Sequence, residues 1–166
     1  GYMLDRTDEE LENLINVNFT SMIYTIRAFM PGMFEKNFGH IINISSASSL
    51  TGAPKLAVYA ATKWAVAGLT ESLRLEVKKM GKYGVKFSSV HPNFLKKGLF
   101  EGTKLNFLGQ LLAPGVKSHD QVAKVIVNRA IKLGFHSPKV PWIMNQMVLF
   151  RAFLPSSLLI KLSSFY

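Results

Sequence analysis

The fold is decided by residues 40–90, which read HIINISSASSLTGAPKLAVYAATKWAVAGLTESLRLEVKKMGKYGVKFSSV. Two short, mostly apolar runs, His40 to Ile44 and Val85 to Val90, have the composition of buried strands. Between them, Ala57 to Met80 has helical length and helical spacing of its apolar positions. Two buried strands joined by a long helix favour a parallel pair with a right-handed crossover, and hence an α/β layered sheet.

The segment before this unit is predicted to be a long helix. Thr7 followed by Glu10 has the pattern of a capping box, and apolar residues then recur at helical spacing as far as Ile26. Pro31–Gly32 is expected to end or bend this helix, with a short further turn that reaches the breaker at Asn37–Gly39.

The segment after the unit adds a helix and a third strand. Ser118 and Gln121 repeat the capping pattern, Gly134 is the expected stop, and Val140–Ile143 is a candidate strand. About three strands are then available, against roughly five or six in an average sheet. No Gly-rich turn joins a first strand to a helix. We therefore expect residues 1–166 to form a single partial α/β domain.

Composition narrows the classes of partner. The formal charge of +10 suits an anionic partner, whether a nucleotide, a phospholipid surface or a nucleic acid. The basic residues are scattered, without the interleaved aromatic platform of single-strand binders, so we expect no nucleic-acid partner. The chain has no cysteine, which excludes disulfides and thiolate sites. We assign no metal site.

Three polar residues carry the candidate chemistry. Tyr59 and Lys63 lie four residues apart on one helix face, where an ammonium is expected to lower the pKa of the phenol and make it a general acid/base. Ser46 follows a strand end, where open α/β sheets bind ligands, and can donate to a carbonyl oxygen. Taken singly, each has an ordinary structural reading: a half-buried tyrosine, a solvated lysine and a turn hydroxyl.

Taken together, these residues carry a family resemblance. Ile42–Ser46 and Tyr59–Lys63, with twelve residues between the serine and the tyrosine, strongly resemble the active-site segment of classical short-chain dehydrogenases/reductases. The resemblance implies a Rossmann-like doubly wound parallel sheet, present here as its C-terminal part. It also implies that Ser46 orients the substrate and that Tyr59 transfers the proton. Lys63 then lowers the tyrosine pKa and binds the nicotinamide ribose.

Further motifs extend the resemblance on both sides. Asn16–Thr20 looks like the family's helix-borne asparagine motif, which makes Asn18 the fourth catalytic residue; a polar helix residue satisfied by backbone is the alternative. The cofactor-binding segment similar to the family's proline-glycine motif begins at Pro92. Its other members are Asn93 in place of the glycine, Leu95, and Lys97 in place of a threonine. Ser48 and Phe94 are assigned to the substrate.

The resemblance also implies a cofactor, a substrate and an assembly. The cofactor is NAD or NADP, with NADP favoured, and the substrate is an alcohol or carbonyl, apolar as in retinoids, steroids or other lipids. Residues 93–117 are expected to form a substrate loop or lid. Residues 140–166 are expected to form an apolar substrate cover or a membrane-facing segment, which leaves peripheral membrane contact open; packing in the core is the alternative. A homodimer or homotetramer is expected, in the cytoplasm or on the cytoplasmic face of a membrane.

The chain begins about where the family's fourth strand is complete, so we expect it to lack the first four strands and their Gly-rich pyrophosphate loop. On that basis it should expose an unpaired sheet edge and bind dinucleotide poorly by itself. The alternative to an enzyme is a truncated, non-catalytic chain that acts only through association with a partner.

Overall fold

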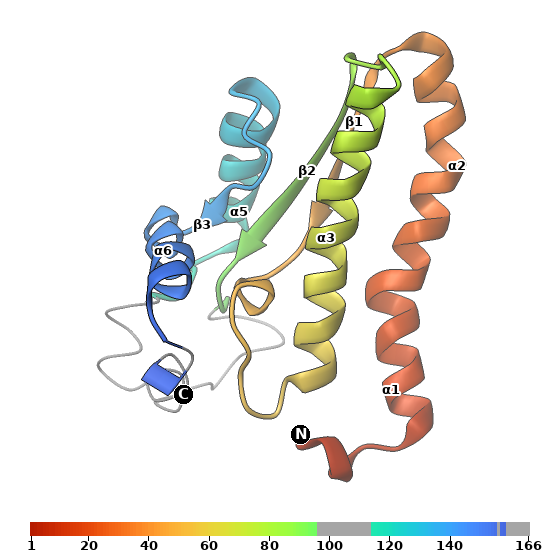
Figure 1. Cartoon of the computed structure of the whole chain (residues 1–166). Coiled ribbons are helices and arrows are strands. Elements are labelled where there is room, and N and C mark those ends of the chain that lie inside the picture. The colour runs from red at the N-terminus through yellow and green to blue at the C-terminus, as the bar shows by residue number, and fades with distance from the viewer. Residues whose placement is uncertain (96–113, 156, 159–166) are drawn as a thin grey trace.

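A computed structural model of the chain describes residues 1–95, 114–155 and 157–158 (Figure 1). The helices and strands follow one another as α1 (Asp8–Ile15), α2 (Ser21–Lys36), β1 (Gly39–Ile44), α3 (Ala57–Lys79), β2 (Val85–Pro92), α5 (His119–Val125), β3 (Lys139–Val140) and α6 (Asn145–Phe153). Short 3₁₀ turns and two π-helical turns complete the described chain: η1 (Met3–Asp5), η3 (Ala47–Ser49), η5 (Trp142–Met144), η2 (Asn16–Thr20) and η4 (Ile126–Lys132).

The predicted strand–helix–strand unit is confirmed. β1 and β2 pair in parallel, with Gly39 opposite Val85 and Ile44 opposite Val90. β3 adds a short parallel pairing on the other side of β2, which gives the order β1-β2-β3. Within the described residues, β1 is therefore an edge strand, and its last residue Ile44 is 46% exposed.

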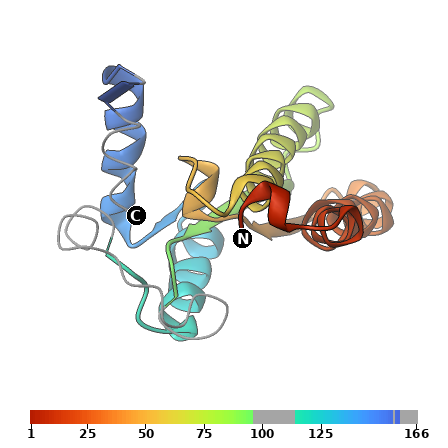
Figure 2. The ribbon, with the colours of Figure 1, turned by 90° about the horizontal axis from the view of Figure 1, so that it is seen from below.

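Helices cover both faces of this sheet, as a doubly wound fold requires (Figures 1 and 2). On one face, α2 and α3 pack over a core built around Ile26, Val77 and Phe87. On the other face, residues of α5 pack over a core built around Val90 and Val140. Each large apolar side chain buried in this way stabilises the fold by about 1.5–3 kcal/mol.

The long N-terminal helix is continuous but not regular. Thr7 accepts from the Glu10 backbone N–H and Glu10 accepts in return, so the capping box is confirmed. An end of the helix at Pro31 is wrong, because α2 runs through Pro31 to Lys36. The breaker at Asn37 is confirmed, since Asn37 is the C-cap in the left-handed conformation with φ 45°. The missing N–H of a helical proline is tolerated here because flanking Met30 and Met33 pack into the core.

The elements after β2 are shorter than the sequence suggests. The predicted helix from Ser118 forms, but its regular part ends at Val125 and a π-helical turn continues to Lys132, before Gly134 at φ +69°. The predicted strand Val140–Ile143 is wrong in its bounds, because β3 ends at Val140. Pro141 has no N–H to donate to a ladder, and the chain turns into η5.

The predicted lid and tail are described only in part. Residues 96–113 of the lid lie outside the described residues, and its ends are tied by a parallel bridge between Leu95 and Val116. In the tail, α6 projects on the same side of the sheet as α3 (Figure 2), and residues 156 and 159–166 lie outside the described part. No helix in the described ranges combines the length and apolarity needed to cross a bilayer.

Candidate active site

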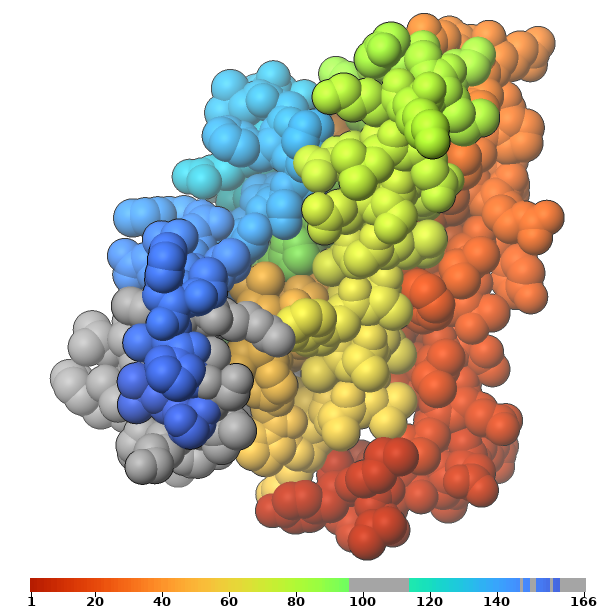
Figure 3. All heavy atoms as spheres, in the orientation of Figure 1, coloured from red at the N-terminus to blue at the C-terminus, as the bar shows by residue number. Residues whose placement is uncertain are grey.

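The candidate site lies where β1 and β2 end and α3 begins. Residues 45–55 follow β1 and surface between α6 and the start of α3 (Figure 3). Ser45 ties this segment to the sheet, because its N–H donates to the Val90 carbonyl at 2.8 Å and its hydroxyl donates to the Lys63 carbonyl at 2.9 Å. The serine loop and the first turns of α3 are therefore fixed to one another.

Ser46 is held at the centre of this loop. Its side chain is 9% exposed and accepts from the Ser48 N–H at 3.1 Å, which caps the short turn η3. The Ser46 hydroxyl is also the hydrogen-bond partner of Tyr59. The two hydroxyls that the sequence assigns to one substrate oxygen are thus neighbours in space.

Tyr59 is half-buried in the first turn of α3. Burial raises the pKa of its hydroxyl, and the hydrogen bond from Ser46 lowers it without offsetting the burial. The expected lowering of this pKa by Lys63 is therefore not what the structure gives. The Lys63 ammonium lies over the Tyr59 ring, 5.6 Å from its centroid.

Lys63 lies one helical turn further along, on the same face as Tyr59. Its Nζ donates to the Ile44 carbonyl at 3.1 Å, which joins the helix to the last residue of β1. Burial lowers the pKa of this ammonium. An ammonium has three donors, of which Ile44 takes one, so Lys63 has donors to offer a bound hydroxyl-bearing ligand.

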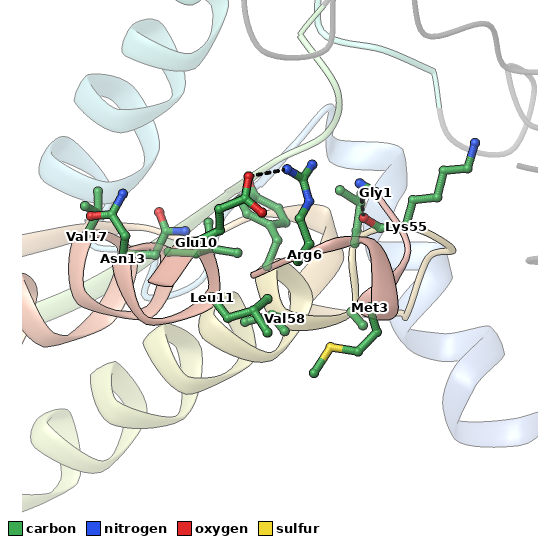
Figure 4. Close-up of a pocket in the computed structure, with 14 residues that line it drawn as sticks. Gly1, Met3, Arg6, Glu10, Leu11, Asn13, Val17, Lys55 and Val58 are labelled. Atoms are coloured by element: carbon green, nitrogen blue, oxygen red, sulfur yellow. Dashed lines mark hydrogen bonds and ion pairs between the residues drawn. The ribbon is translucent and has the colours of Figure 1, made fainter. Parts of the chain in front are cut away.

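Asn18 reaches this region from a different element. It lies, half-buried, in the π-helical turn η2, a widened turn of the kind found at functional sites. With Tyr59 it lines a cavity of about 530 Å³ between the N-terminal helix and the start of α3. Figure 4 shows the outer wall of this cavity, where Arg6 and Glu10 form an ion pair at 3.0 Å and the Gly1 amine lies near Lys55.

The predicted cofactor-binding segment leaves β2 at Pro92. Asn93 is 4% exposed; its N–H donates to the Val140 carbonyl at 2.8 Å and its side-chain amide donates to the Pro114 carbonyl at 3.1 Å. Asn93 stands where the family has a glycine, and its φ is not positive. Asn93 instead fastens the start of the loop to β3. Lys97 lies outside the described residues.

The two predicted substrate residues share a small cavity. Ser48 and Phe94 line a space of about 20 Å³ beside η3. Met144, only 1% exposed, closes the same space from η5. Sequence reasoning did not single out Met144, because nothing local distinguishes it from other apolar residues of the tail.

Known proteins of one family are similar to this chain. Residues 1–105, more than half of the chain, match the short chain dehydrogenase family. The chain belongs to the short-chain dehydrogenase/reductase family. Human epidermal retinol dehydrogenase 2 is 34% identical over 154 residues, which are 92% of this chain and 48% of that protein. The chain thus spans about half the length of the curated relatives it matches.

Solved structures of the family agree on the fold. A short chain dehydrogenase from Burkholderia cenocepacia J2315 in complex with NADP superposes with a TM-score of 0.76 at 22% identity, over 97% of this chain and 64% of that one. A Burkholderia phymatum member in complex with NAD gives 0.74 at 22% identity, over 92% of this chain and 60% of that one. The predicted partial Rossmann-like sheet is confirmed by these matches.

Proposed function

We propose that the protein containing this chain is an NAD(P)-dependent oxidoreductase that interconverts an alcohol and a carbonyl. The observation that carries the proposal is the Ser46–Tyr59 hydroxyl pair, with Lys63 one helical turn away, at the carboxyl end of parallel strands. That edge is where ligands bind in open α/β sheets. Family membership and the complexes of two structural relatives with NAD and NADP support the cofactor class.

Tyr59, Ser46 and Lys63 have different roles in the transfer of the proton. In reduction, the Tyr59 hydroxyl donates its proton to the substrate carbonyl oxygen, while Ser46 donates a hydrogen bond to the same oxygen. In oxidation, the Tyr59 phenolate accepts the proton of the alcohol. The raised pKa of Tyr59 keeps the phenol protonated before reduction, and the lowered pKa of Lys63 helps that ammonium to release a proton.

The residues around this pair suit a dinucleotide's nicotinamide end. Lys63 offers ammonium donors, and β2 ends at Pro92, with Asn93 and Leu95 directly after it at the same edge of the sheet. The bound cofactor would supply or accept the hydride. Asn18 belongs to the same proposal, as the polar group that lines the cavity beside Tyr59.

An apolar alcohol or carbonyl is the substrate class that we propose. Phe94 and Met144 form the apolar side of the small cavity next to Ser48, and the similar human protein is named as a retinol dehydrogenase. Residues 142–153, which comprise η5 and α6, are called the α6 region here. Its exposed apolar residues, among them Trp142 at 60% and Phe153 at 82%, extend this surface outward. They support either a substrate cover or contact with a membrane surface.

Assembly and cofactor choice are further proposals. The outer faces of α2 and α3 carry Tyr24, Phe29 and Trp64, which are 66%, 63% and 40% exposed, and such a surface suits pairing of two copies. NADP is preferred over NAD because the chain's net charge of +10 suits the additional phosphate.

The test compares the complete gene product with a variant that lacks the Tyr59 hydroxyl. With retinol and NAD⁺ or NADP⁺, formation of the reduced nicotinamide is followed by absorbance. Tyr59→Phe is expected to reduce kcat by roughly 10²–10⁴-fold, because the proton has no donor or acceptor. Tyr83→Phe, an exposed tyrosine between α3 and β2, is the matched control. Equal rates in both variants would contradict the assignment of Tyr59.

The competing proposal is a non-catalytic chain that acts through a partner. It is favoured by β1, which is an edge strand within the described residues. Fluorescence titration of the 166 residues with NADH and NADPH tests how much these residues do alone. We expect no saturation at micromolar cofactor, because the pyrophosphate loop is not among them. Micromolar affinity would show that they suffice for binding.

A further inference from the structure

A buried histidine lies directly behind the serine loop. His91, in β2, is only 2% exposed, although an imidazole is costly to bury unless its nitrogens are hydrogen-bonded. Both nitrogens have partners. Nδ1 lies 2.8 Å from the Ser49 hydroxyl, and Nε2 lies 2.9 Å from the Ser89 hydroxyl and 3.0 Å from that of Ser137.

The partners determine which nitrogen carries the proton. The Ser49 hydroxyl donates its only hydrogen to the Ser46 carbonyl at 2.6 Å, so Nδ1 must donate to Ser49. Nε2 is then the acceptor for the hydroxyls of Ser89 and Ser137. Ser137 is free to donate because its oxygen accepts from another residue, Lys139 Nζ, at 3.1 Å.

A protonated ring does not fit this set of bonds. His91 would then donate from both nitrogens, and the acceptor role of Nε2 would be lost. Burial lowers the pKa of His91 to about 4, with a further lowering by Lys139 and a smaller raising by a hydrogen bond to the Ser46 backbone. The other charged or titratable groups that line its cleft of about 280 Å³ are Glu71 and Arg74 of α3 and His136. Near neutral pH the ring is therefore neutral.

We propose that His91, as the neutral Nδ1–H tautomer, is a positioning residue that fixes the Ser46 carbonyl through Ser49 and so holds the Ser46 hydroxyl toward Tyr59. This inference rests on the proposed function of Ser46. Its physical basis is a rigid path of two short hydrogen bonds from the sheet to the backbone of the catalytic loop. His91 also directly precedes Pro92, so the same ring links the serine loop to the start of the cofactor segment.

Two serines offer a matched comparison, because each is a hydroxyl partner of the same ring. Ser49→Ala cuts the path to Ser46, whereas Ser137→Ala cuts only the opposite side. We expect kcat to fall roughly tenfold or more in Ser49→Ala, since small displacements of a reacting group are costly. In Ser137→Ala, kcat should stay within about twofold, which is the ordinary scatter of a variant that removes no transition-state contact.

Substitution of the ring itself separates its two nitrogens. Asn places an amide where Nδ1 was, and Gln places one where Nε2 was. His91→Asn should therefore recover most of the kcat that His91→Leu loses, and His91→Gln should not. A merely structural role predicts that kcat follows the melting temperature in all three variants, and that result would overturn the proposal.

A readout independent of activity tests the tautomer. In protein labelled with ¹⁵N-histidine, the His91 resonance, assigned by its loss in His91→Asn, should show a protonated Nδ1 and an unprotonated Nε2 at pH 7. The opposite tautomer would overturn the proposal. Full activity in Ser49→Ala combined with an inactive Tyr59→Phe would overturn this inference and leave the proposed function standing. A parent protein without oxidoreductase activity would overturn both.

Discussion

The serine loop and the α6 region lie at the same end of the molecule and are built in opposite ways. Residues Ser45 to Ser49 are all at most 9% exposed, and their polar groups bond to the backbone and to one another. In the α6 region, Trp142 and Phe153 are 60% and 82% exposed. Proton transfer needs atoms held within tenths of an ångström, whereas contact with an apolar molecule needs only surface. The hydrogen bonds are therefore found in the serine loop, and the exposed apolar area in the α6 region.

The largest expected effect comes from the sheet beneath the serine loop. Phe87, a residue of β2, is fully buried against the helices. Phe87→Ala should therefore reduce the free energy of unfolding by about 3–5 kcal/mol through lost burial and the cavity left behind. Denaturant unfolding measures it. Phe38→Ala, at a site 77% exposed, is the control and should change little. Similar losses in both would show that the sheet does not carry the rigidity of the loop.

Removal of one hydroxyl tests the loop directly. Ser46→Ala should reduce kcat by roughly 10²–10³-fold, as loss of a donor to a developing oxyanion does. It also removes the acceptor for the Ser48 N–H. Steady-state kinetics of the complete gene product are compared with those of Ser72→Ala, an exposed serine of α3. A kcat within twofold of the parent would place the substrate oxygen elsewhere.

Acid should reduce the stability of the fold through protonation of His91. The pKa of His91 is about 4 in the fold and near 6.5 unfolded. The unfolded state therefore binds the extra proton between these values, and stability falls as the pH drops from about 6.5 to 4. The loss from this group is at most ~3 kcal/mol. Unfolding at pH 7 and pH 4.5 should show a weaker pH dependence in His91→Asn; equal slopes would contradict the shift.

The smallest expected effect on stability comes from the α6 region. Phe153→Ser should change the free energy of unfolding by no more than about 0.5 kcal/mol, because the side chain is already 82% exposed. KM for an apolar alcohol such as retinol should nevertheless rise several-fold, with kcat unchanged. Phe38→Ser, at a site 77% exposed, is the control. Should Phe153→Ser leave KM unchanged, liposome flotation of the same pair would decide whether the surface meets a membrane instead.

Local sequence features allowed the central unit to be predicted. The apolar runs at β1 and β2, the helical spacing of α3 and the capping box at Thr7 each express a preference of neighbouring residues, and the structure keeps all of them. The i, i+4 placement of Tyr59 and Lys63 follows from helix geometry alone. The serine position after β1 follows from the strand end. For these reasons the structure brings together the three residues that the sequence proposed.

Other features depended on contacts that no local pattern encodes. α2 passes Pro31 because core packing outweighs one lost hydrogen bond, and β3 stops at Val140 because the next residue cannot extend the ladder. The raised pKa of Tyr59 depends on its burial, which spacing along the chain does not reveal. The position of Lys97 in the cofactor segment stays a prediction.

The sequence by itself determined the parallel strand pair, its crossover helix and the line of hydroxyl, phenol and ammonium along one edge, because periodicity and spacing act between neighbours. Only the tertiary structure decided the partners of His91, which come from residues up to 46 positions away in the chain. It also decided how Asn93 and Met144 are used. Hydrogen bonds and burial of this kind arise only when distant segments are packed together, and that packing selects the environment of each reacting group.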